Sequence, residues 1–172
     1  QCPCSFLTVQ TVSEILTEQG YEQLCEGGCW NLQAGGRYFV TRNQSSLLAF
    51  RVPSADFTGY MITAAHDESP SYKVKWNSEI AENGYVKLSV EPYGGMNAAS
   101  WLDRPLSVAG RVLVADGGKL ISRFINIDRD LLLIPSVALH LNRSQEGGKL
   151  NPAVDMLPLY AVGSDHVDFL EV

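Results

Sequence analysis

The chain has 172 residues, of which 45% are hydrophobic and 19% charged, and its 13 basic and 19 acidic side chains leave a net charge of −6. This composition excludes intrinsic disorder, and a chain of this length can bury about two-thirds of the surface that its unfolded form exposes. Folding therefore requires neither disulfides nor metals. A pI near 5.0 without a basic cluster argues against nucleic acid as a partner.

The start of the chain bears on its location and completeness. No apolar run approaches the roughly 18 residues that span a bilayer, and residues 1–5 lack the charged start and apolar stretch of a signal peptide. We therefore expect a cytoplasmic protein without a membrane partner. Because the chain begins with Gln rather than Met, we also expect a processed chain or a piece of a longer one.

Four cysteines lie near the start, at Cys2, Cys4, Cys25 and Cys29. The even number allows disulfides or a structural zinc site. Zinc sites usually contain two pairs with two to four residues inside each pair, and Cys2-Pro3-Cys4 is too close for that pattern. The spacing favours free thiols in a reducing compartment.

The first predicted element is a helix. Apolar residues recur with helical spacing at Val9, Val12, Ile15 and Leu16. Thr11 and Glu14 form a possible capping box, and Gly20 is a natural C-terminal stop. We predict one amphipathic helix over residues 5–19.

After the helix the pattern changes to short β-rich runs separated by glycine-containing turns. The predicted strands are residues 37–42, 46–50, 59–64, 72–76, 85–90, 106–114 and 119–127. Asp116-Gly117-Gly118 lies between two apolar runs and predicts a hairpin. Residues 131–135 have the pattern of a buried segment, and residues 144–149 that of a polar loop. One helix among many strands predicts a strand-rich α+β fold, since a complete α/β domain would need more crossover helices.

The sharpest local feature is the end of the predicted strand at 59–64, which delivers His66, Asp67 and Glu68 into a turn. A buried strand fixes such side chains while the loop stays accessible. A neutral imidazole can bind a divalent metal while a nearby carboxylate accepts its other N–H. A solvated polar turn has the same pattern, and one histidine does not make a site.

Several segments of the sequence resemble motifs of a known family. The segment 66–70 (HDESP) resembles the His-x-Asp-Ser-Pro segment of the aspartyl aminopeptidase family, which are co-catalytic zinc exopeptidases. Further segments resemble motifs of that family in the family's order: 35–43 (GGRYFVTRN), 90–95 (VEPYGG), 101–112 (WLDRPLSVAGRV), 127–129 (IDR), 134–135 (IP) and 138–143 (ALHLNR). Each segment alone is weakly specific, whereas their joint order is highly specific.

The resemblance implies a mixed α/β catalytic domain interrupted by a β-rich domain that mediates dimerisation and higher assembly. Residues 1–72 would be the first segment of the catalytic domain, and residues 73–172 the first part of the insertion. The implied activity is a two-zinc aminopeptidase that removes N-terminal residues, acidic ones by preference, from peptides. The implied partner is a second copy of the chain, in a homodimer or a larger oligomer.

The resemblance also assigns roles to individual residues. His66 would be a zinc ligand supported by the carboxylate that follows it. The family has a small residue and then Asp there, whereas this chain has Asp67 and then Glu68, so either carboxylate could take that role. His140 would contact bound substrate in the active site of a neighbouring subunit, or it is a structural histidine at the end of an apolar segment. His166 matches no family ligand and is expected on the surface.

The family's other ligands come from later segments that this sequence does not contain. A catalytic zinc takes three protein ligands and an open position, so we expect the 172-residue chain alone to be inactive. The alternative function is a non-catalytic oligomerisation or binding module derived from the family. A coding region that continues past Val172 with the remaining ligands would favour the enzyme.

Two groups of side chains are expected to be structural. We expect Asp103, Arg104 and Arg111 to form ion pairs that orient loops. Aromatic residues in strand-like runs are expected in the core or an interface: Tyr38, Phe39, Phe50, Tyr60 and Trp76.

Overall fold

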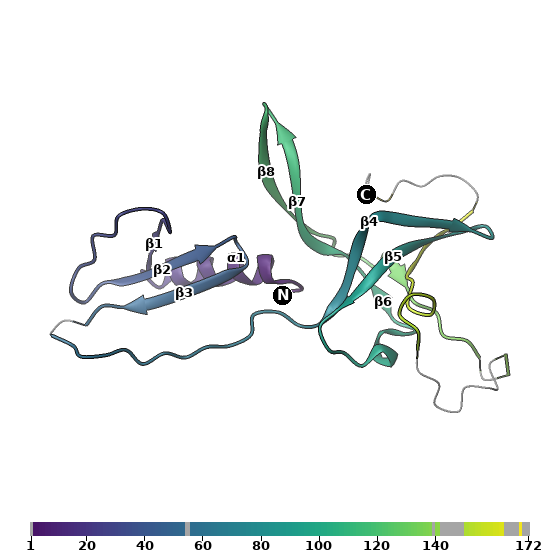
Figure 1. The fold of residues 1–172 in the computed structure, drawn as a ribbon, viewed down its shortest axis with the longest axis horizontal. Helices are drawn as coiled ribbons and strands as arrows, with labels where there is room; N and C mark the ends of the chain where they lie inside the picture. The colour runs from purple at the N-terminus through teal and green to yellow at the C-terminus, as the bar shows by residue number, and fades with distance from the viewer. Residues whose placement is uncertain (1, 54–55, 139, 142–149, 164–168, 170–172) are drawn as a thin grey trace. The chain divides into compact units, whose positions relative to one another are not determined.

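The computed structural model describes residues 2–53, 56–138, 140–141, 150–163 and 169. Within these ranges the chain forms one α-helix, ten strands and a short 3-10 helix (Figure 1). The chain divides into two compact units: unit 1 contains residues 1–69 and 109–126, and unit 2 contains residues 70–108 and 127–172. The expected strand-rich α+β class is confirmed.

The helix α1 spans Ser5–Glu18 and ends where the sequence predicts. Gly20 has a φ of +76°, and its N–H donates to the carbonyl of Thr17 at 3.0 Å. The N–H of Tyr21 donates to the carbonyl of Leu16 at 2.9 Å. These two bonds form a Schellman motif, in which a residue with positive φ satisfies the last carbonyls of the helix.

The expected capping box is wrong, because the helix begins earlier than Thr11. The cap residue is Cys4, and Thr11 and Glu14 lie in the middle of the helix. Hydroxyl groups within the helix instead donate to the carbonyl four residues earlier, as Ser13 does to Val9 at 2.7 Å. No helix of the described residues is long and apolar enough to cross a membrane.

The first sheet, in unit 1, has three strands in the order β1-β2-β3. They are β1 (Glu22–Leu24), β2 (Arg37–Arg42) and β3 (Ser46–Arg51), with β1 parallel to β2 and β2 antiparallel to β3. Tyr38 and Phe39 of β2 are buried, so they belong to the core as expected. The two predicted strands are confirmed, while β1 was not predicted.

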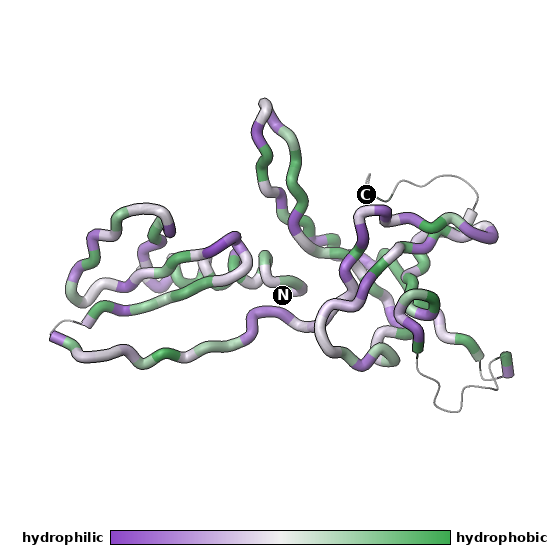
Figure 2. The backbone as a smooth tube through the Cα atoms, in the orientation of Figure 1, coloured by the Kyte–Doolittle hydropathy of each residue, from purple (hydrophilic) through white to green (hydrophobic). Residues whose placement is uncertain are grey.

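Unit 1 also contains a long hairpin formed by β7 (Ala109–Asp116) and β8 (Lys119–Asn126). Gly117 and Gly118 connect the strands with φ values of +54° and +77°, as a type I′ turn requires, which confirms the predicted hairpin. Figure 2 shows apolar residues along this hairpin. Several of them are exposed: Val112, Leu113, Val114 and Leu120.

The second sheet, in unit 2, has the strand order β4-β5-β10-β9-β6. Its strands are β4 (Ser71–Glu82), β5 (Tyr85–Tyr93), β6 (Pro105–Leu106), β9 (Leu132–Leu133) and β10 (Leu159–Val162), and the 3-10 helix η1 spans Ala98–Trp101. Leu88, Val90 and Leu132 form its core cluster, and Ile134 is also fully buried. The predicted buried segment at 131–135 is confirmed in part, because Leu133 is 39% exposed and Pro135 is exposed. The predicted strand at 106–114 is divided between β6 and β7.

The predicted strand at 59–64 is wrong. These residues have no regular secondary structure, and Tyr60, Met61 and Ile62 are 68%, 102% and 84% exposed. A strand requires a neighbour for its backbone N–H and C=O groups, and this segment pairs with no strand of the described residues. Trp76, which lies where β4 bulges between Val74 and Glu79, is 97% exposed and outside the core.

The burial of Leu88 leads to a stability prediction. Its side chain is fully buried, so Leu88→Ala should lower the free energy of unfolding of unit 2 by about 2–5 kcal/mol through lost burial and a residual cavity. Leu141→Ala is the matched control, because Leu141 lies in the same unit and is 83% exposed. Urea denaturation would measure both, and equal losses would contradict the assigned core.

Candidate functional site

The three residues expected at a metal site lie in unit 1, on irregular backbone after β3. The side chain of His66 is exposed, and those of Asp67 and Glu68 are half-buried. Because the expected strand did not form, no sheet holds this segment in the described residues. The three residues therefore lie together because they are consecutive in the sequence, and not because a sheet places them.

One hydrogen bond involves the imidazole. The backbone N–H of Glu68 donates to Nδ1 of His66 at 3.3 Å. A neutral ring that accepts a bond at Nδ1 carries its proton on Nε2. Metal binding needs a nitrogen lone pair, so coordination through either ring nitrogen would break this bond. The distance is beyond the usual range for an N–H donor, so the bond is weak and its loss costs little.

The described residues do not form a metal site by themselves. They contain no group of three or more His, Cys, Asp and Glu side chains that could hold a metal ion. Cys2, Cys4, Cys25 and Cys29 form no disulfide among the described residues. His66 is thus one candidate ligand where a catalytic zinc takes three.

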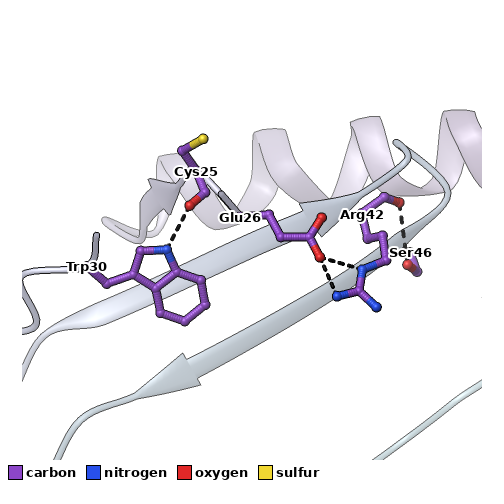
Figure 3. A network of polar contacts seen from close by, with 5 residues as sticks. All are labelled: Cys25, Glu26, Trp30, Arg42 and Ser46. Carbon is purple, nitrogen blue, oxygen red and sulfur yellow. Dashed lines mark hydrogen bonds and ion pairs between the residues drawn. The ribbon is translucent and has the colours of Figure 1, made fainter. Parts of the chain in front are cut away.

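The loop that contains Cys25 is held by other side chains (Figure 3). Nε1 of Trp30 donates to the carbonyl of Cys25 at 2.7 Å, and the carboxylate of Glu26 forms an ion pair with Arg42 of β2. The hydroxyl of Ser46 reaches the carbonyl of Arg42 at 3.5 Å. Backbone, ring and ion-pair contacts hold this loop, and the thiols take no part in them.

Arg111 joins two of the segments that carry the resemblance. Its Nη1 donates to the backbone carbonyl of Asn43 at 2.9 Å and to Oδ1 of the same residue at 3.1 Å. Its guanidinium lies 4.3 Å from the ring centroid of Phe6 in α1, and that ring stacks on Phe124 of β8. The expected loop-orienting role is present, but the partners are a turn and a ring rather than a carboxylate.

Asp103 makes a similar connection in unit 2. It has a φ of +54°, and its N–H donates to the carbonyl of Ile134 at 2.9 Å. Its Oδ1 accepts the N–H of Ser136 at 2.8 Å. Hydrogen bonding by Ser136, through its side chain and then its backbone, lowers the pKa of the Asp103 carboxyl. Asp103 therefore binds the backbone of Ile134 and Ser136 rather than forming the expected ion pair.

His140, the expected substrate contact, is exposed and belongs to unit 2. It lies in a turn in which the N–H of Leu141 donates to the carbonyl of Ala138 at 2.9 Å. His140 follows Ser136 by four residues, and sequence reasoning missed the bond between Ser136 and Asp103. The predicted loop at 144–149 and His166 lie outside the described residues.

Comparisons with known proteins give one consistent result. A family model described as aminopeptidase I zinc metalloprotease (M18) matches residues 1–168. The probable M18 family aminopeptidase 2 of Clostridium acetobutylicum is 41% identical over 169 residues, covering 95% of this chain and 39% of the relative. The chain thus spans about two-fifths of the length of this relative.

Solved structures share the fold. A chain in the cryo-EM structure of the Ape4 and Nbr1 complex matches with a TM-score of 0.88 at 36% identity, covering 93% of this chain and 32% of that one. The Saccharomyces cerevisiae mApe1 dodecamer matches with a TM-score of 0.70 at 22% identity, covering 94% and 36%. The second likeness concerns the fold alone.

The lowered pKa of Asp103 leads to a prediction about acid stability. A carboxylate whose pKa is lower in the folded state adds stability that is fully present above its ordinary pKa of 3.8 and is lost as the pH falls through the folded value. Asp103→Asn should therefore be less stable than the wild type at neutral pH, and the gap should close on acidification. Urea midpoints between about pH 7 and pH 3 would measure the gap. A gap that is constant with pH would contradict the ionic role of Asp103.

Proposed function

Because the chain belongs to the M18 family of aminopeptidase I zinc metalloproteases, we propose that the protein that contains it is a zinc-dependent aminopeptidase acting on free peptide N-termini. The observation that carries the proposal is the family match over residues 1–168. The substrate preference is for acidic N-terminal residues, as the resemblance of the motifs implies. The compartment is the cytoplasm.

His66 supplies one zinc ligand in this proposal. It stands in the segment that resembles the family's His-x-Asp-Ser-Pro motif, its side chain is exposed, and the hydrogen bond to Nδ1 that must break before it coordinates a metal is weak. The further ligands and the general base belong to parts of the protein outside this chain, since the curated relative is much longer. When bound in a pair, zinc ions polarise the scissile carbonyl and lower the pKa of the attacking water.

Asp67 and Glu68 have a supporting role. A carboxylate that accepts the second N–H of a coordinating histidine fixes the tautomer and the orientation of the ring. Both residues are half-buried and directly follow His66. Glu68 is one methylene longer than the Asp of the family motif, so Asp67 is the alternative partner.

The 172-residue chain alone is inactive in this proposal, because its described residues contain no complete set of metal ligands. That same observation favours the second candidate function, a non-catalytic oligomerisation or binding module. A coding region that continues with the missing ligands would support the enzyme, and a stop codon directly after Val172 would support the module.

Assembly is part of the proposed function. Residues 1–72 form the first segment of a catalytic domain, and residues 73–172 begin an inserted domain that mediates dimerisation. His140 contacts substrate in the active site of a neighbouring subunit. Support comes from its exposed position and from the exposed apolar residues of the β7–β8 hairpin.

The proposed role of His66 is tested by His66→Ala in the full-length protein. Loss of a residue that only supports a ligand costs about 10–100-fold in metal affinity or activity, so loss of the ligand should cost at least about 100-fold. Hydrolysis of an aspartyl anilide and zinc content by atomic absorption are the measurements. The matched control is His166→Ala, which should leave both unchanged. A His66→Ala protein with normal zinc content and turnover would refute the assignment.

The proposed role of His140 is tested by complementation between subunits. His66→Ala and His140→Ala should each be impaired, because each lacks one group of every site. Co-expression should restore activity, since a mixed dimer has one site with both histidines intact; random pairing would restore about a quarter of the sites. Co-expression of His66→Ala with the His66→Ala/His140→Ala double variant is the control and should restore nothing. No recovery in the first mixture would mean that His140 does not act across subunits.

A further inference from the structure

The turn that carries His140 is exposed, so its position depends on a few contacts with the rest of unit 2. Within unit 2, Val137 and Leu141 on either side of it are 60% and 83% exposed, so packing holds them weakly. The bond between Leu141 and Ala138 closes the turn on itself and does not attach it to the sheet. Among the described residues, the attachment of this turn comes from the residues before it.

The chain enters this turn from a firmly held position. Leu132 and Leu133 form β9, and Ile134 is fully buried. The N–H of Asp103 binds the carbonyl of Ile134, and the carboxylate of Asp103 binds the N–H of Ser136 at 2.8 Å. Asp103 thus fixes the backbone beyond the buried strand as far as Ser136.

Asp103 itself is well placed to act as an anchor. It follows η1, whose Trp101 packs edge-on against Tyr72 of β4 with ring centroids 5.1 Å apart, and it precedes β6, which pairs with β9. A hydrogen bond to a charged carboxylate is roughly twice as strong as a neutral one. The anchor is therefore attached to the sheet on both sides.

We propose that Asp103 is a positioning residue for His140: its carboxylate holds Ser136 and so fixes the point at which the turn that carries His140 begins. The inference rests on the proposed role of His140 in substrate contact. From Ser136, four residues lead to His140, a span of at most about 13–14 Å. Loss of the carboxylate moves the fixed point back to Ile134 and adds two unanchored residues to that span. The lowered pKa of Asp103 agrees with a carboxylate that is charged when it holds Ser136.

Two substitutions at Asp103 separate the anchor from the backbone conformation. Asp103→Gly removes the acceptor and tolerates a φ of +54° without strain. Asp103→Asn keeps an acceptor oxygen, and Asn is among the residues that adopt positive φ. Asp130→Gly is the matched control at another exposed aspartate of unit 2.

Steady-state hydrolysis of an aspartyl anilide by the full-length protein tests the proposal. A displacement of about 1 Å can cost about 100-fold in rate, and a loosened turn should cost less, so kcat/KM should fall about tenfold in Asp103→Gly. Asp103→Asn should recover to within about twofold to threefold, because it still accepts the bond. Asp130→Gly should leave kcat/KM unchanged.

The double variant Asp103→Gly/His140→Ala identifies the route of the effect. If Asp103 acts through His140, the double variant should be no worse than His140→Ala alone, since coupled residues are non-additive. A merely structural role would instead multiply the two losses, and that result would overturn the proposal. If Asp103→Gly does not fold, Ser136→Pro takes its place, because it removes the donor and keeps Asp103.

The remaining outcomes are also decisive. An impaired His140→Ala together with normal Asp103→Gly would overturn this inference and leave the proposed role of His140 intact. A normal His140→Ala would overturn the role of His140, and this inference with it. Tenfold loss in Asp103→Gly, recovery in Asp103→Asn and no further loss in the double variant together would support the proposal.

Discussion

The contact between Arg111 and Asn43 is the constraint on which unit 1 depends. One guanidinium binds the turn between β2 and β3 and lies over Phe6 of α1, so it links the sheet, the helix and the β7–β8 hairpin. A two-stranded hairpin is only marginally stable by itself in water, and it gains stability from such an attachment. Charged hydrogen bonds and a ring contact together contribute at most about 2–4 kcal/mol, and less where solvent reaches them as it does here, against a stability of about 5–15 kcal/mol for a domain.

In unit 2 a charged side chain also binds the backbone of a distant segment, but here the side chain is a carboxylate rather than a guanidinium. Asp103 holds the chain that leaves β9, and Ser136 is held by its carboxylate rather than by a neighbouring strand. In both units a charged side chain binds backbone atoms of a distant segment. Both charged residues, Asp103 and Arg111, lie in the segment 101–112 that carries part of the family resemblance. Their role in the described structure is to hold turns in place, and the chemistry then depends on what those turns carry.

The sequence predicted features that depend on local chemistry and failed where the outcome depends on distant partners. The end of α1 at Gly20 and the hairpin turn at Gly117-Gly118 were predicted, because positive φ favours glycine at those positions. Residues 59–64 were predicted as a strand because their apolar pattern is that of a buried strand, but burial needs a neighbour that the described residues do not supply. His66 was singled out as a candidate ligand by its motif, which is a local sequence feature. The bond between Asp103 and Ser136 joins residues 33 positions apart, and no periodicity indicates such a pair.

The division of the chain into units has a consequence for synthesis. Unit 1 is discontinuous in sequence, because residues 70–108 of unit 2 lie between its two parts. Asn43 leaves the ribosome well before Arg111, which follows it by 68 residues. The helix and the first sheet therefore lack the β7–β8 hairpin during the time in which β4, β5 and β6 are synthesised. The entropic cost of closing a loop grows only slowly with its length, but contacts between residues far apart in the sequence form late in folding. The exposed apolar segment around Met61 is available to chaperones, or to aggregation, during that interval.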